Sequence, residues 1–178
     1  MISMSTSAGP PTRRLAILSG GLSALLGLSV LIAWHTHNAS LLQVHHEWIA
    51  MVYNTALLFV VAGLGLVATA FHRARSARAC ALAILAFSLT VLAQYVLGRD
   101  LGVDRLFMHP YLTTATGHPG RMAPNTCLCF ALVGAALLLL NRPDRPRVRG
   151  IGGGVIGTIV LGVSVNGLLG YVTGISIA

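Results

Sequence analysis

This sequence has very little charge for its length. Only 9% of its 178 residues are Asp, Glu, Lys or Arg, and 55% are hydrophobic. A soluble domain carries about 25% charged residues, because its surface must be hydrated. The mean hydropathy of +0.79 points the same way. The composition therefore excludes an ordinary soluble domain and predicts a membrane protein.

Lysine is absent and the acids number only four, so arginine alone accounts for the net charge of +8. These arginines lie between apolar runs, which is typical of membrane loops and does not indicate a nucleic-acid partner. The three cysteines lie inside apolar segments. Their odd number and their positions argue against a disulfide framework.

Five apolar stretches are long enough to cross a bilayer, which needs about 20 helical residues. None contains a charged or histidine side chain, and none alternates polar and apolar residues as barrel strands do. We therefore expect an all-α, polytopic integral membrane helical bundle. Residues 1–14 would form a disordered cytoplasmic tail and residues 15–178 the membrane domain. The expected spans are 15–34, 49–71, 79–98, 123–141 and 151–172.

The density of arginine in the connections predicts the orientation. Arginines are dense before the first span and in the connections 72–78 and 142–149, dilute in 99–122, and absent from 35–48. The positive-inside rule then places the N-terminus in the cytoplasm, and five spans place the last residue outside. A cleaved twin-arginine signal at Arg13-Arg14 is an alternative, although the following apolar run is longer than a signal core.

An internal repeat is the most specific feature. Residues 51–59 and 122–130 share the pattern M-x-x-N-T-x-L-x-F, and residues 95–98 and 171–174 share Y-V-x-G. The unit is a two-helix hairpin that occurs twice in the same orientation, a tandem parallel duplication. We expect Asn and Thr at the start of each unit to satisfy the free N–H groups of a helix N-terminus, with Pro124 of the second unit in the first turn. Alternatively, the Asn amides bond a neighbouring helix and hold the two repeats in register, or they bind a ligand. The motif residues are Met51, Asn54, Thr55, Phe59, Met122, Pro124, Asn125, Thr126 and Phe130.

These motifs resemble a known membrane region. The two N-T-x-L-x-F segments, above all 120–130, and the segment 94–104 are similar to the multi-span N-terminal sensor region of bacterial sensor histidine kinases and diguanylate cyclases with PAS or GGDEF modules. The resemblance covers about residue 49 to the end. It implies a sensory or anchoring input module in a bacterial inner (cytoplasmic) membrane. The family usually has a further N-T-like helix after a segment like 170–178, where this sequence ends.

From the resemblance and the span count we expect a fragment that lacks its cytoplasmic output domain. Its partners would be the lipid bilayer, a second copy packed through transmembrane helices, and a cytoplasmic signalling module. A small transporter or channel subunit is the alternative. No catalytic constellation is present, so we do not expect an enzyme.

Histidines are the candidate ligands for a metal. None lies inside an expected span, which argues against a haem held between helices. We expect no cofactor. A zinc or copper site is a weak possibility, and protonation of the pair at 45 and 46 is another, since imidazole titrates near neutral pH. The candidates are His45, His46, His109 and His118.

Overall fold

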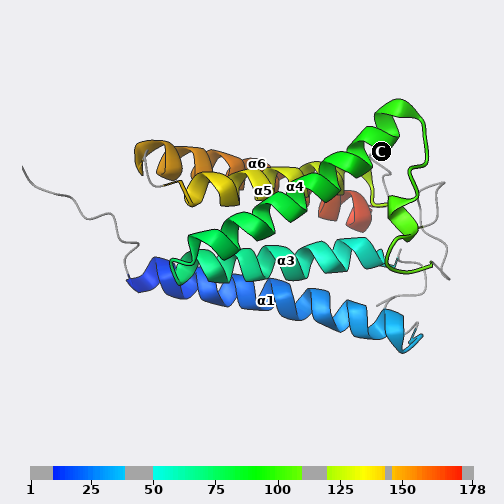
Figure 1. Cartoon of the computed structure of the whole chain (residues 1–178), viewed down its shortest axis with the longest axis horizontal. Helices are drawn as coiled ribbons and strands as arrows, with labels where there is room; N and C mark the ends of the chain where they lie inside the picture. Colours follow the sequence, from blue (N-terminus) through cyan, green and yellow to red (C-terminus); the bar gives the residue numbers. More distant parts are fainter. Residues whose placement is uncertain (1–9, 39–49, 110–119, 143–145, 174–178) are drawn as a thin grey trace, which may run out of the picture.

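A computed structural model describes residues 10–38, 50–109, 120–142 and 146–173. These residues form α helices and one 3-10 turn, with no strand among them (Figure 1). The predicted all-α class is confirmed. The elements are α1 (Pro10–His35), α3 (Tyr53–Ala70), α4 (Ala74–Leu97), η1 (Val103–Arg105), α5 (Pro124–Leu140) and α6 (Pro146–Thr173).

Three of the described helices, α1, α3 and α4, are long and apolar enough to cross a membrane. Helix α5 has 17 residues, and the apolar part of α6 is Gly150–Asn166. Both lie at the lower end of the roughly 17–25 residues that a span needs.

Helices α1, α4 and α6 each begin five residues before the start of the predicted span, and α3 begins four residues after the start of its predicted span. Helix α1 begins at Pro10, so residues 10–14 are helical and do not belong to a tail. Proline fits there because the first helical turn needs no N–H donor. The second helix begins at Tyr53, after an extended Val52. Residues 1–9 of the predicted tail lie outside the described residues.

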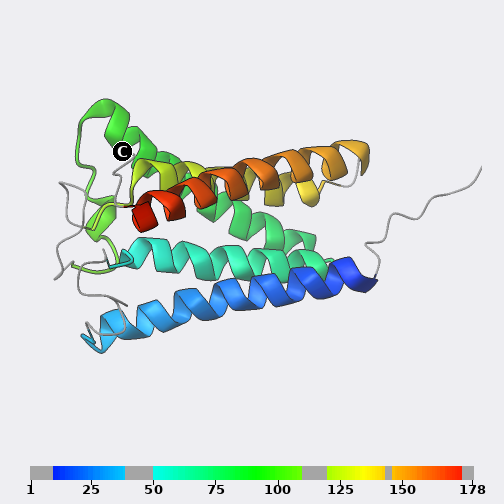
Figure 2. The ribbon, with the colours of Figure 1, turned by 180° about the vertical axis from the view of Figure 1, so that it is seen from behind.

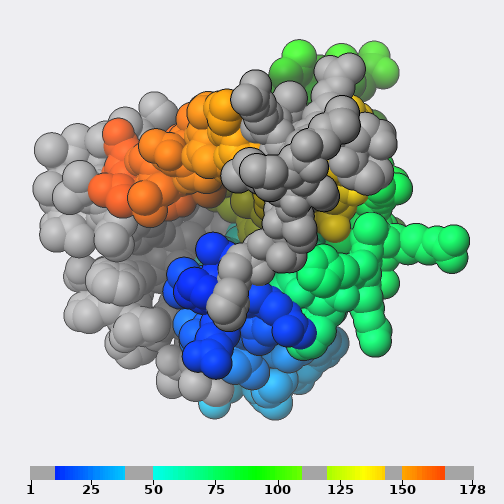
Figure 3. Space-filling model, turned by 90° about the vertical axis from the view of Figure 1, so that its left-hand side faces the viewer, coloured from blue at the N-terminus to red at the C-terminus, as the bar shows by residue number. Residues whose placement is uncertain are grey.

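The helices lie roughly along one axis and alternate in direction (Figures 1 and 2). We call the end where α1, α4 and α6 begin the turn end, and the opposite end, where α3 and α5 begin, the loop end. Figure 3 looks onto the turn end, with the starts of α1 in blue and α4 in green and α6 in orange. Helix α3 packs against α1 and α4, whereas α5 packs against α4 and α6. Helices α3 and α5 also touch each other.

The described surface is apolar where a soluble protein would be polar. Helix α1 exposes large aliphatic side chains along most of its length, and α6 exposes a second set that includes Ile151 and Leu161. In water such contiguous apolar surface would favour aggregation, whereas in lipid it needs no cover. The exposed residues of α1 are Leu15, Leu18, Leu22, Leu25, Leu26, Leu28 and Ile32.

Equivalent positions of the repeat have equivalent packing roles. A Cβ at Gly63 would meet the backbone of α1, and one at Gly134 would meet Ala81 and Leu85 of α4. Each glycine thus lets its helix approach the helix that precedes it, as small residues do in membrane bundles. The repeated phenylalanines, Phe59 and Phe130, meet edge to face with ring centroids 5.2 Å apart. The repeat is therefore visible in the packing.

Candidate functional site

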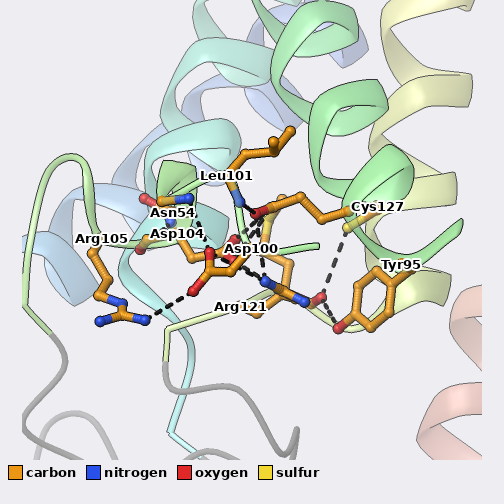
Figure 4. A network of polar contacts seen from close by, with 11 residues as sticks. Asn54, Tyr95, Asp100, Leu101, Asp104, Arg105, Arg121 and Cys127 are labelled. Carbon is orange, nitrogen blue, oxygen red and sulfur yellow. Dashed lines mark hydrogen bonds and ion pairs between the residues drawn. The ribbon is translucent and has the colours of Figure 1, made fainter. Parts of the chain in front are cut away.

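A buried ion pair lies at the loop end. Arg121 Nε donates to Asp104 Oδ2 at 2.7 Å, and the two side chains are only 3% and 4% exposed. Among the described residues, these are the only buried charged side chains. Taking two charges out of water costs several kcal/mol per ion, and only good geometry with additional hydrogen bonds offsets that cost. The pair is the centre of what we call the loop-end cluster, which comprises Asn54, Gln94, Asp100, Asp104 and Arg121 (Figure 4).

The backbone after α4 brings Asp104 back over the helix ends. Helix α4 ends with Gly98 in the left-handed region, at φ 60°, and Gly102 has φ 73°. Glycine adopts these values without the steric penalty that a Cβ would bring. Between them, Asp100 Oδ1 accepts the N–H of Gly102 at 2.9 Å. The chain then enters η1, whose second residue is Asp104.

Gln94 links α4 to both charged partners. Its Oε1 accepts the N–H of Leu101 at 2.8 Å and Arg121 Nη2 at 3.4 Å. Its Nε2 lies 3.3 Å from each carboxylate oxygen of Asp104. The Gln94 side chain is fully buried, at 0% exposure. The Gln94 amide is therefore a hydrogen-bond partner for the backbone of Leu101 in the turn after α4 and for both members of the ion pair.

Asn54 links α3 to the same cluster. Its Nδ2 donates to the backbone oxygen of Asp104 at 2.9 Å. Its Oδ1 is buried and has no hydrogen-bond partner in the described part of the chain. The residue thus gains one bond and leaves one acceptor unsatisfied, which limits its net contribution to stability.

Tyr95 and Asp100 complete the surroundings of Arg121. The guanidinium carbon lies 5.4 Å from the centroid of the Tyr95 ring, within the range of a cation–π contact. The Tyr95 hydroxyl donates to the Met122 backbone oxygen at 2.8 Å, which fixes the start of α5. Arg121 Nη2 also lies 3.4 Å from Asp100. Three helices, α3, α4 and α5, are therefore tied to one ion pair.

Asp100 faces water, and it pairs with Arg105 at 2.9 Å. The N–H of Gly102, with a further contribution from Arg105, holds the pKa of Asp100 below its ordinary value of 3.8. Asp100 is therefore ionised at neutral pH. The cluster contains two carboxylates and, with Arg105, two guanidinium groups, so its charges balance among the described residues. Balanced charges favour positioning of helices over binding of a charged ligand.

The repeat asparagines lie in different environments. Asn54 is 2% exposed and belongs to the cluster, whereas Asn125 is exposed and its Oδ1 accepts the N–H of the next residue at 2.8 Å. The N–H of Thr126 belongs to the first turn and has no intrahelical partner, so Asn125 plays the expected role, whereas Asn54 bonds the backbone of Asp104 instead. Residues Val52 and Ala123 occupy the N-cap positions, and neither helix has a side-chain cap. Helix geometry explains this, because each Asn lies inside the first turn, past the cap position.

The other motif residues occupy helix starts and the core. Pro124 is the first residue of α5, as predicted. Met122 and Phe130 are buried in the core between α3, α4 and α5, and Phe59 packs against that core. Thr55 is buried, Thr126 is half-buried, and Met51 packs beside the end of α1.

Only one of the four candidate metal ligands lies among the described residues. His109 is exposed, and His45, His46 and His118 lie outside the described residues. No group of three potential metal-ligating side chains occurs in the described ranges.

The sequence reasoning did not identify the pairing of Asp104 with Arg121. One signal was available: Gln94 is a lone amide at the end of an apolar helix, and such a residue needs partners. The same stretch, 94–104, carries part of the resemblance noted above. No family model, curated protein or solved structure matches this chain.

Proposed function

We propose that this chain is a membrane-embedded sensory input module of a bacterial signal-transduction protein, passing a signal to a cytoplasmic signalling module. It would lie in the inner membrane with its turn end in the cytoplasm. The observation that carries the proposal is the loop-end cluster, because the buried ion pair there bonds Asn54 of α3 and Gln94 of α4, and its arginine lies in the connection just before α5. A stimulus that alters the cluster would move those helices together.

The distribution of charge supports this placement in a membrane. The described arginines of the turn end are exposed and lie where α1, α4 and α5 begin or end. Between the two ends, the described helix surfaces are largely apolar. A bilayer would cover that surface and leave both polar ends at its interfaces. The turn-end arginines are Arg13, Arg14, Arg73, Arg75, Arg78 and Arg142.

The mechanism would be a small shift between two packings. Glycine contacts such as Gly63 against α1 and Gly134 against α4 have little side-chain interdigitation to resist sliding. Shifts of about 1–2 Å at helix interfaces are a common form of switching. A stimulus acts only through its different affinity for the two packings. The loop-end cluster is where such a difference would have the greatest effect, because it joins the three helices.

A transporter or channel has less support. Transport of ions or protons typically uses charged side chains within the membrane interior. The buried charges of the described chain lie at the loop end, beyond the end of α4 and before the start of α5. The inputs to a sensor, in contrast, are received at one end and transmitted along helices.

The proposal is tested by perturbing the loop end and measuring the turn end. Arg75 and Arg142 would each be replaced by an amino acid with a ketone side chain, to which a spin label is attached. The distance between the two labels would then be measured by pulsed EPR on the full chain in lipid nanodiscs. Arg121→Gln should shift the distance by about 1–2 Å or more. Arg105→Gln is the matched control, since Arg105 is an exposed arginine of the same end, and should leave the distance unchanged.

An unchanged turn-end distance in the Arg121→Gln variant would contradict the proposal, provided that the folded fraction is the same. A flux of ions or small solutes through proteoliposomes containing the wild-type chain would favour the transporter.

A further inference from the structure

The turn end concentrates positive charge. The six turn-end arginines named above are all exposed. The ion pairs of the described ranges all lie at the loop end, so none of them neutralises a turn-end arginine. In the sequence one acid, Asp144, lies near these segments, and its position falls outside the described residues. Such an unbalanced set of guanidinium groups attracts anions from its surroundings.

Contacts with neutral groups hold two of these arginines in place. The guanidinium carbon of Arg13 lies 5.0 Å from the centroid of the Phe71 ring, at the end of α3. Arg78 donates from Nη2 to the backbone oxygen of Asn141 at 2.7 Å. Neither partner carries a charge, so these contacts leave both guanidinium groups without a counter-ion. A side chain that is already positioned loses less conformational entropy when it binds an anion, and this favours binding.

The arginines of α1 lie next to an apolar surface. A shallow hollow at the start of this helix is lined by Pro11, Arg14, Leu15 and Leu18, and its volume is about 530 Å³. All four lining residues are exposed. The hollow therefore combines one positive charge with three apolar side chains. A molecule with an anionic head and an apolar tail would match both parts.

The apolar part of the hollow continues along one face of α1. Residues three or four apart lie on the same face of a helix, so Arg14 is followed on that face by Leu18, Leu22 and Leu25, which are all exposed. We call these four residues the α1 strip. Eleven residue steps of 1.5 Å make the strip about 16 Å long. This is close to half of the roughly 30 Å hydrocarbon core, the depth that the acyl chains of one leaflet fill.

We propose that the turn end binds anionic phospholipids of the adjacent leaflet. A headgroup phosphate lies at Arg14, one acyl chain follows the α1 strip, and the other turn-end arginines attract further anionic headgroups. A zwitterionic phospholipid fits the strip equally well, but its own ammonium group reduces its attraction to arginine. The site is therefore selective by charge. This inference rests on the placement of the chain in a membrane, and it does not require the sensory role.

The α1 strip favours a lipid over an anion dissolved in water. Nucleic acid or an acidic protein would be attracted by the same positive charge, but either would leave the exposed leucines of the strip uncovered. A phospholipid covers both features at once, because its phosphate and its acyl chains belong to one molecule. The continuity of Arg14 with Leu18 therefore decides between the two kinds of anion.

The test is photo-cross-linking of the full chain in nanodiscs that contain equal amounts of phosphatidylglycerol, which is anionic, and phosphatidylcholine, which is zwitterionic. A diazirine amino acid replaces Leu18, and the captured lipids are identified by mass spectrometry. Phosphatidylglycerol should be captured in at least about fivefold preference, the effect of one arginine near an anionic headgroup. The same group at Leu161, an exposed residue of α6 outside the hollow, is the control and should capture both lipids about equally.

Substitutions of Arg14 test whether its charge gives the selectivity. In the chain with the diazirine at Leu18, Arg14→Gln should lower the preference for phosphatidylglycerol by about fivefold. Arg14→Lys keeps the charge and should retain most of the preference. Arg105→Gln is the matched control, since Arg105 is an exposed arginine of the opposite end, and it should leave the preference unchanged.

Equal capture of the two lipids at Leu18 would overturn the proposal, as would a preference that Arg14→Gln leaves unchanged. Replacing chloride with inorganic phosphate at the same ionic strength should have no effect on the preference. Its loss under that exchange would assign the arginines to a soluble anion and overturn the proposal too. Capture of no lipid at either Leu18 or Leu161 would overturn the membrane placement as well.

Discussion

The two ends of the bundle solve the same problem with different chemistry. At each end an arginine ties helices together: Arg121 at the loop end and Arg78 at the turn end. Arg78 Nη2 donates to the backbone oxygen of Asn141 at 2.7 Å, and Asn141 Nδ2 donates to Thr69 Oγ1 at 2.8 Å. These bonds connect α4, the end of α5 and α3. The helices joined are the same three that the loop-end cluster joins.

The difference lies in burial and in the charge of the partner. Arg78 is exposed and bonds a neutral carbonyl, whereas Arg121 is 3% exposed and bonds a carboxylate. An exposed guanidinium that loses its partner is hydrated by water, so little is lost. A buried one has no such substitute. From this comparison we expect the loop end to be the more rigid and the turn end the more adjustable of the two.

The largest expected effect comes from removing the buried cation. Arg121→Gln leaves the Asp104 carboxylate buried without its counter-ion, so the free energy of unfolding should fall by about 3–5 kcal/mol. Steric-trap unfolding in bicelles measures this quantity. If the free energy of unfolding fell by less than about 1 kcal/mol, the value for an exposed pair, the buried pair at the loop end would contribute no more than an exposed one, and the proposed difference between the two ends would be wrong.

The two repeat asparagines offer a smaller contrast. Asn54→Ala removes the bond to the Asp104 backbone and should cost about 1–2 kcal/mol, the usual range for a buried carbonyl that loses its donor. Asn125→Ala should change stability by less than about 0.5 kcal/mol, as exposed substitutions do. The same unfolding assay measures both. If both substitutions lowered the free energy of unfolding equally, the contribution of these asparagines would come from their shared position in the repeat and not from the loop-end cluster.

A weaker effect is expected at the turn end. Arg78→Gln removes exposed hydrogen bonds to Asn141 and should destabilise the chain by about 0.5–1 kcal/mol. Arg75→Gln is the control, because no interaction of Arg75 is described. If Arg78→Gln were as costly as Arg121→Gln, the turn end would be as rigid as the loop end.

The smallest effect concerns pH. The pKa of Asp100 is lowered in the folded chain, so its contribution to stability is present above its ordinary value of 3.8 and is lost as pH falls through the lower, folded value. Asp100 should therefore cause no change in the midpoint of thermal unfolding between about pH 5 and 8. Below about pH 4 the midpoint should fall more in the wild type than in Asp100→Asn. A difference between the wild type and Asp100→Asn that appears between about pH 5 and 8 would contradict the assignment.

Sequence patterns predicted the helices well because lipid imposes a simple rule. Long apolar runs with arginines between them leave few alternatives to membrane-length helices. The duplicated M-x-x-N-T-x-L-x-F pattern identified Phe59 and Phe130 as equivalent positions, but their contact is seen only in the structure. The beginning of α1 was misplaced because Arg13 and Arg14 appeared to end the apolar run, although charged residues readily continue a helix.

The loop-end cluster was beyond this kind of reasoning. Asp104 and Arg121 are separated by 17 residues of a connection with no periodicity, so no pattern relates them. The repeat was misleading for Asn54 and Asn125, because identical motifs suggested identical roles. Their environments differ since only α3 lies beneath the turn that follows α4. Such information resides in tertiary packing.

The most direct test of the central claim is a double-mutant cycle between Asp104 and Arg121, with unfolding free energies measured for Asp104→Asn, Arg121→Gln and the pair. If the buried ion pair holds the loop end together, the double variant should be less destabilised than the sum of the single variants, with a coupling of about 2–3 kcal/mol. Additive losses, with coupling below about 0.5 kcal/mol, would show that the two residues act independently and would contradict the account.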